Sequence, residues 1–371
     1  MSRNIFSKST SRAAHSVYTG KRHALRASGA WARVAAVLIV FAVVATSLPV
    51  GASAAGTQPA APELISKGAC VLDFETGIML FGYEEGAHRV PASMTKLLTA
   101  YVIYDAVKAG EIKLADEAVI SKKVSDFSYN REYSNVQLPE GSKVSIGKLL
   151  DVVLIMSACA AATALGEALC GSEEEFVARM NKKVAQFDTQ ACFFDAYGGS
   201  PDNMISPLGM ARLSRGIIRD HPEILKITSQ TSVTFGDRKY NSTNSLLGQY
   251  AGMDGLKTGF TNPAGCCFAG TAQRDGRRII VVVMGAATGS GRFADSRKLL
   301  DYGFEVAAGA VIKYLEENMT AYGAGIIYAL LANAGMLPAV RLSRDADTGV
   351  ITATFYERDR NSGAASGEAA A

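Results

Sequence analysis

The stretch GLKTGFTNPAGCCFAGTAQRDGRRIIVVVMGA, Gly255 to Ala286, decides the fold. It contains three runs of β-forming residues, separated by NPAG at 262–265 and DG at 275–276. Short connections of these residue types join antiparallel neighbours. We therefore expect a meander of three antiparallel strands near the end of the folded domain.

The segments on either side of this meander predict the rest of the domain. Residues 68–85, GACVLDFETGIMLFGYEE, are typical of two strands around a turn, and residues 91–110 predict a helix that is apolar on most faces. Residues 115–225 have mostly helical patterns, and residues 292–309 predict an amphipathic helix. This order predicts an α/β domain at 60–305, with an antiparallel sheet assembled from both ends of the sequence, flanking helices and an inserted helical subdomain.

The first 54 residues form a separate segment. Seven basic residues and no acidic ones precede the apolar run VAAVLIVFAVVATSLPV, 34–50, and Ala52-Ser53-Ala54 follows that run. A basic start, a short apolar run and a small-residue cleavage site are typical of a secretory signal peptide. An uncleaved N-terminal anchor is the alternative, because the apolar run is just short of a comfortable membrane span. Either interpretation predicts that the rest of the chain is extracytoplasmic.

The composition excludes several classes of function. With 48% hydrophobic and 20% charged residues, the 371-residue chain is typical of a packed globular protein. The formal net charge of +3 comes from the leader, and the remaining chain carries about −4, so nucleic acid is not an expected partner. The four histidines are scattered and CxxC is absent, so neither a metal site nor a cofactor is expected. Most of the six cysteines lie in apolar runs, which favours buried free thiols over disulfides.

Residues 306–371 form a short C-terminal segment of different character. The uncharged run at 319–340 permits a membrane helix, although its polar residues, glycines and proline argue against one. Residues 349–359, GVITATFYERD, are typical of an edge strand, and the last residues predict a disordered tail. Membrane association through this segment therefore stays an open prediction.

Two motifs carry residue types suited to nucleophilic catalysis. Ser93 and Lys96 lie three positions apart, on one face of the predicted helix that begins at Ser93. A serine hydroxyl needs a base, and a lysine serves as one when an apolar site or a second cation lowers its pKa. On the first strand of the meander, Lys257 and Thr258 present an ammonium and a hydroxyl that suit a carboxylate, and Gly259 leaves room for a substrate along the strand.

These motifs, S-x-x-K followed by K-T-G, resemble those of penicillin-binding proteins and β-lactamases. The segments PASMTKLLTAYVIY, 91–104, NSTNSLLGQYAGMDGLKTGFTNPAGCCFAGTAQRDGRRIIVVVMGA, 241–286, and SRKLLDYGF, 296–304, carry a closer resemblance. They resemble the D-alanyl-D-alanine carboxypeptidases, the low-molecular-mass penicillin-binding proteins. The resemblance runs from about Leu64 to Phe304 and implies the penicillin-binding-protein/β-lactamase-like fold.

The resemblance also implies roles for individual residues. It implies that Ser93 is the acyl-ester nucleophile and Lys96 its general base, with the backbone N–H groups of Ser93 and Phe260 as the oxyanion hole. It further implies that Lys257 and Thr258 hold the terminal carboxylate of a peptidoglycan stem peptide. Arg292 matches a family arginine that assists them. β-Lactam antibiotics are the other expected ligands.

The third motif of the family departs from its pattern here. It falls at Ser157-Ala158-Cys159, within the apolar run VVLIMSACAAATALGEAL, 152–169, which predicts a buried helix. The resemblance implies that Ser157 relays a proton, whereas Cys159 occupies the place of an asparagine whose amide orients the lysine and the substrate. A thiol donates and accepts hydrogen bonds only weakly. Ser128-Tyr129-Asn130 has the family's letters but lies outside the expected helix, so we interpret it as unrelated to the site.

Three functions are therefore compared. The first is an exported serine-type D-alanyl-D-alanine carboxypeptidase that penicillin acylates. The second is a catalytically weakened relative that binds peptidoglycan, which Cys159 motivates. The third is a β-lactamase, although nothing resembles the glutamate-containing loop that class A enzymes use for deacylation. A Ser-His-Asp triad is not expected, because His88 and His221 lie outside any motif and are predicted to be solvated loop residues.

Overall fold

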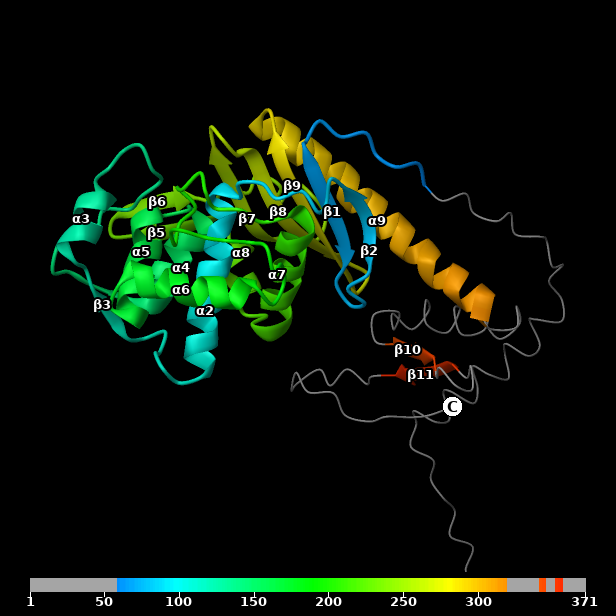
Figure 1. Ribbon diagram of the computed structural model, residues 1–371, viewed down its shortest axis with the longest axis horizontal. Coiled ribbons are helices and arrows are strands. Elements are labelled where there is room, and N and C mark those ends of the chain that lie inside the picture. Colours follow the sequence, from blue (N-terminus) through cyan, green and yellow to red (C-terminus); the bar gives the residue numbers. More distant parts are fainter. Residues whose placement is uncertain (1–58, 319–339, 345–350, 356–371) are drawn as a thin grey trace, which may run out of the picture. The chain divides into compact units, whose positions relative to one another are not determined.

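The computed structural model describes residues 59–318, 340–344 and 351–355. Its centre is a five-stranded, fully antiparallel sheet with strand order β2-β1-β9-β8-β7 (Figure 1). The strands are β1 Gly68–Asp73, β2 Met79–Tyr83, β7 Met253–Thr261, β8 Gly265–Arg274 and β9 Arg277–Ala286. The predicted meander is thus confirmed, as is the assembly of the sheet from both ends of the sequence.

Turn chemistry and apolar runs explain how the two ends meet. The backbone N–H and the hydroxyl of Thr76 both donate to Asp73 Oδ1 at 2.8 Å, which closes the predicted turn between β1 and β2. Strand β9 lies in the middle of the sheet, paired on one side with β1 and on the other with β8. Its run of isoleucines and valines is buried on both faces, as a central strand requires.

Alternating side chains of the strands build two cores, one on each face of the sheet. Val71, Val281 and Val283 pack in one core with Leu299 and Leu300 of α9, Gly289–Asn318. Their sequence neighbours point into the larger core, which the helices on the opposite face share (Figure 1). Helices α7, Pro207–Asp220, and α8, Ile224–Thr228, pack on the sheet. The other helices that share this core are α2 Thr95–Lys108, α3 Lys122–Ser128, α4 Ile146–Ile155, α5 Cys159–Cys170 and α6 Glu173–Val184.

The predicted single helix over residues 152–169 is wrong in one respect. The chain forms two helices there, because α4 ends at Ile155 and α5 begins at Cys159. Between them Ser157 has φ +73°, a left-handed conformation that a helix cannot contain. An apolar composition signals burial but does not report this break.

Two small two-stranded sheets also escaped prediction. One pairs β3, Glu117–Val119, with β4, Lys143–Ser145. The other pairs β5, Ser232–Phe235, with β6, Arg238–Asn241. Strands of three or four residues are too short to show a clear alternation of polar and apolar residues.

The ends of the chain are described only in part. The leader, the run at 319–339 and the tail lie outside the described residues. The predicted strand near the C-terminus is present as β11, Ile351–Phe355, paired with β10, Val340–Arg344. Helix α9 continues across the predicted boundary at 305/306 to Asn318. No helix of the described segments has the length and apolar character needed to cross a membrane.

All six cysteines are free, which confirms that prediction. Four of them are buried, and the two that are half-buried, Cys170 and Cys192, are the two whose sequence surroundings are not apolar. Burial raises the pKa of the Cys70 thiol to about 12, so this thiol is a small apolar core residue.

Candidate active site

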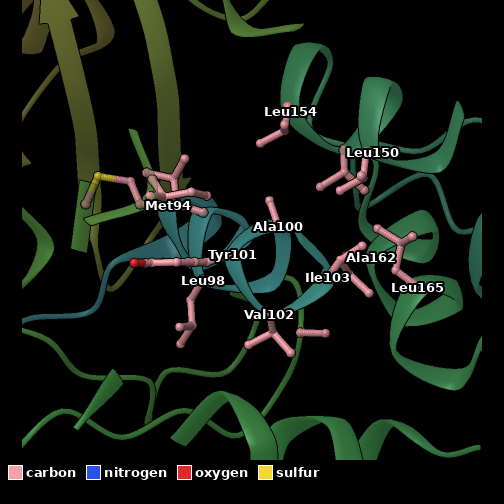
Figure 2. Close-up of a cluster of buried hydrophobic side chains, with 14 of the residues drawn as sticks. Met94, Leu98, Ala100, Tyr101, Val102, Ile103, Leu150, Leu154, Ala162 and Leu165 are labelled. Carbon is pink, nitrogen blue, oxygen red and sulfur yellow. The ribbon is translucent and has the colours of Figure 1, made fainter. Parts of the chain in front are cut away.

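Ser93 and Lys96 lie where a short turn runs into the central helix. Ser93 belongs to the 3-10 turn η1, Ala92–Met94, and not to the α-helix itself, which begins at Thr95. The spacing of three still brings Lys96 Nζ to 2.9 Å from Ser93 Oγ. Figure 2 shows apolar side chains of α2 packed with those of α4 and α5. Lys96, which also belongs to α2, is fully buried.

Lys96 Nζ makes three contacts that fix its direction. It donates to Ser93 Oγ at 2.9 Å, to the Tyr197 carbonyl at 2.6 Å and to Cys159 Sγ at 3.3 Å. An ammonium has three N–H donors, so these contacts use all of them. When the amine is neutral, it has a lone pair free to accept the Ser93 proton.

The residues that present the Tyr197 carbonyl were missed by sequence reasoning. The buried Asp195 carboxylate accepts from the backbone N–H groups of Tyr197 at 2.9 Å and Ser200 at 2.5 Å, and also from Gly198. A Cβ at Gly198 would lie 2.0 Å from the Ala92 carbonyl, so only glycine lets this loop reach η1. The local signal of a tight loop was the run of turn residues GGSPDN, 198–203, which begins three positions after Asp195.

Strand β7 carries the second motif directly beside η1. A Cβ at Gly259 would lie 2.6 Å from the Pro91 carbonyl and 3.2 Å from the Ser93 nitrogen. Glycine is therefore required for the strand and the Ser93 turn to touch. Thr258 Oγ1 donates to Thr243 Oγ1 at 2.6 Å, a partner that sequence reasoning also missed. Phe260, which follows, is 59% exposed.

Lys257 is a buried lysine at the same place. It is 1% exposed, and its Nζ donates to the Thr258 carbonyl at 3.0 Å. Burial, followed by the charge of Lys96, lowers the pKa of Lys257 well below its usual range. Two buried lysines thus converge near Ser93, which creates a site that favours an anion.

Arg292 supports β7 from the first turn of α9. Its Nη1 donates to the Gly259 carbonyl at 2.9 Å and to the Cys267 carbonyl at 3.3 Å. The guanidinium therefore links β7 and β8 behind the K-T-G segment.

Ser157 and Cys159 lie at the corner between α4 and α5, and the side chain of Cys159 contacts Lys96. Both side chains are buried, and Cys159 Sγ reaches the Ser157 carbonyl at 3.6 Å as well as Lys96. The left-handed φ of Ser157 turns the chain so that α5 begins beside Lys96. Cys159 is therefore a neighbour of the lysine, as the family position implies.

The other candidate residues have partners elsewhere. The prediction of a solvated loop residue is wrong for His221, whereas His88 is a half-buried loop residue. His221 is 2% exposed and lies 2.7 Å from Asp105 Oδ1, and His88 Nε2 lies 3.0 Å from Asp188 Oδ1. His221 ends α7 beneath the rings of α2, which bury it. Ser128 accepts from the Leu138 N–H at 3.0 Å, within the loop that follows α3.

The chemistry of the cluster is that of acyl transfer to a serine. It combines a hydroxyl, a buried amine in hydrogen-bond contact with it, and a second ammonium beside a hydroxyl-bearing strand. No group of three or more histidine, cysteine, aspartate or glutamate side chains capable of holding a metal occurs in the part of the chain that the structure describes.

An antiparallel sheet with a Ser-x-x-Lys turn packed on its K-T-G strand defines the penicillin-binding fold. The chain belongs to the D-alanyl-D-alanine carboxypeptidase family, whose sequence model matches residues 55–288. It is 34% identical over 247 residues to D-alanyl-D-alanine carboxypeptidase DacA of Haemophilus influenzae, covering 66% of this chain and 63% of that protein. It is 35% identical over 248 residues to DacD of Salmonella typhimurium, covering 65% and 64%. The chain thus spans slightly less than two thirds of the length of these relatives.

Solved structures show the same fold. Penicillin-binding protein 5 of Haemophilus influenzae matches with a TM-score of 0.64 and 34% identity, over 67% of this chain and 73% of that one. Penicillin-binding protein D2 of Listeria monocytogenes, solved in an ampicillin-bound form, matches with a TM-score of 0.58 and 32% identity. That match covers 66% of this chain and all of the Listeria chain.

Proposed function

We propose that this chain is a serine-type D-alanyl-D-alanine carboxypeptidase. The observation that carries the proposal is the contact between Lys96 Nζ and Ser93 Oγ at 2.9 Å, next to the strand with Lys257. The substrate is the stem peptide of peptidoglycan, and penicillin is an alternative acylating agent. Family membership and the ampicillin-bound Listeria relative support both ligands.

In the proposed reaction, neutral Lys96 accepts the Ser93 proton while Ser93 Oγ attacks the penultimate D-alanine carbonyl. The N–H groups of Ser93 and Phe260 stabilise the oxyanion, and Lys257 with Thr258 binds the terminal carboxylate. Ser157 relays a proton to the leaving amine, so the bond to the last D-alanine breaks. Water then hydrolyses the acyl-enzyme and regenerates the Ser93 hydroxyl.

The segments outside the catalytic region complete the proposal. Residues 1–54 act as a signal peptide or an N-terminal anchor, residues 60–305 form the catalytic domain, and residues 306–371 are an appended segment. This organisation and a peptidoglycan substrate both support a location outside the cytoplasm.

The proposal predicts that Ser93 carries out two reactions, the release of D-alanine from a peptide and the covalent uptake of penicillin. The full chain is expected to release free D-alanine from a peptide ending in D-Ala-D-Ala, and fluorescent penicillin is expected to label it. Peptide mass spectrometry should find the penicilloyl group on Ser93. A protein that takes up no label and releases no D-alanine is instead the weakened relative. Rapid turnover of a chromogenic cephalosporin would favour the β-lactamase.

Cys159→Asn is expected to speed acylation by about three- to tenfold, because an amide oxygen accepts from the Lys96 ammonium better than sulfur does. The side chains have similar volumes, so the buried site accommodates the change. The rate of penicillin labelling under single-turnover conditions measures the effect. Cys159→Ala, which offers no acceptor, is the control and should not be faster than the wild type. An unchanged rate in Cys159→Asn would mean that another group, such as the Tyr197 carbonyl, already replaces the asparagine.

A further inference from the structure

Helix α5 begins without a cap of its own. Ala158 precedes its first residue and offers no side-chain acceptor to the free N–H groups of the first turn. These groups find acceptors in a loop about 25 positions earlier. The Cys159 N–H donates to the Ser134 carbonyl at 2.8 Å, and the Ala160 N–H donates to Asn135 Oδ1 at 2.8 Å.

The other end of the Asn135 amide is also engaged. Its Nδ2 donates to the Phe127 carbonyl at 2.9 Å and to the Asn130 carbonyl at 3.3 Å. One side chain thus joins the end of α3, the loop after it and the start of α5. Buried Val136 and Leu138 anchor the loop immediately beyond it.

The same loop contacts the second partner of Lys96. The rings of Phe127 and Tyr133 lie 4.9 and 5.7 Å from the Tyr197 ring, measured between centroids. The Tyr197 carbonyl is the acceptor for Lys96 Nζ, and Cys159 Sγ is its other neighbour besides Ser93. The segment from Phe127 to Asn135 therefore supports both groups that aim the lysine.

We propose that Asn135 is a positioning residue: by capping α5 it holds Cys159 against Lys96 and so keeps the lysine aimed at Ser93. Asn135 touches neither Ser93 nor Lys96, and it acts through the start of α5. The effect on acylation rests on the proposed function, whereas the effect on Cys159 does not.

Acylation by fluorescent penicillin measures the first effect in the full chain. Asn135→Ala is expected to lower the maximal acylation rate by about tenfold or more, because small displacements of a catalytic group slow a reaction strongly. The penicillin concentration for half-maximal rate should change less than about twofold, because β7 is untouched. Asn135→Asp keeps an acceptor for the Ala160 N–H but loses the two hydrogen bonds that Nδ2 donates, so its maximal acylation rate should fall less than that of Asn135→Ala.

Ser172→Ala is the matched control. Ser172 caps α6 by accepting from the Glu175 N–H, so its loss removes a similar bond from a helix that bears none of the candidate catalytic residues. This variant should acylate at the wild-type rate. The proposal is overturned if the maximal acylation rate falls equally in Ser172→Ala and Asn135→Ala. It is also overturned if that rate is unchanged in Asn135→Ala. If Asn135→Ala does not fold, a fall of about tenfold in Asn135→Asp overturns it instead.

A second measurement needs no activity. Iodoacetamide alkylation of Cys159, followed by peptide mass spectrometry, is expected to be about tenfold faster in Asn135→Ala than in the wild type, because the start of α5 opens. Ser172→Ala should leave the rate unchanged. A wild type that takes no penicillin label but shows this difference contradicts the proposed function and supports the positioning role. Equal Cys159 alkylation rates in all variants overturn the positioning role.

Discussion

Removing either the Ser93 hydroxyl or the Lys96 amine is expected to abolish penicillin acylation, and removing both should cost no more than removing one. The two groups act as a unit, since the hydroxyl is a poor nucleophile without a base and the base has no proton to accept without the hydroxyl. We expect the acylation rate to fall by at least about a thousandfold in Ser93→Ala, in Lys96→Met and in the double variant. Methionine fills the volume of the fully buried lysine, so packing is retained.

The rate of label incorporation by the purified full chain measures this loss. Lys183→Met is the matched control, since Lys183 is also largely buried and its Nζ pairs with Asp105 at 2.8 Å. Lys183 lies on α6, so the acylation rate of Lys183→Met should stay within about twofold of the wild-type rate. Substantial labelling of Lys96→Met would show that another base serves Ser93. Losses in the two single variants that add up in the double variant would show that the residues act separately.

Lys257→Met is expected to stabilise the protein while disabling the site. The lysine ammonium is buried and faces the charge of Lys96, so folding opposes its protonation. Replacing a poorly compensated buried charge with an apolar side chain is expected to raise the free energy of unfolding by about 1–3 kcal/mol. Acylation should fall on the order of a hundredfold, because the carboxylate of penicillin loses its cation.

The pH dependence of this stability difference follows from the lowered pKa of Lys257. Because the pKa is lower in the folded state, the unfolded chain binds more protons, and wild-type stability rises as pH increases from the folded pKa towards the unfolded one. The advantage of Lys257→Met is therefore largest at low pH and shrinks as pH increases through that window. Denaturant unfolding at several pH values checks the trend. An advantage that grows with pH would contradict a charge buried at a cost.

The proximity of residues within one motif could be predicted from the sequence, because each motif is local. Ser93 and Lys96 are three positions apart, so any tight helical turn brings them together. The same reasoning failed for the apolar run at 152–169, where Ser157 breaks the helix. It failed again for His221, which the sequence shows among loop-like residues and which the packing of α7 against α2 buries.

The sequence by itself determined the meander and the turn at Thr76. It also determined that Lys96 lies on a helix and Lys257 on a strand. Turn chemistry and apolar alternation act over a few residues, and an unfolded chain already carries them. Only the tertiary structure decided what surrounds Lys96. Cys159 lies 63 positions away and the Tyr197 carbonyl 101 positions away, and α5 finds the acceptor for its Ala160 N–H in Asn135. These contacts depend on how α3, α5 and the Asp195 loop pack around α2, and such packing is set by the whole core.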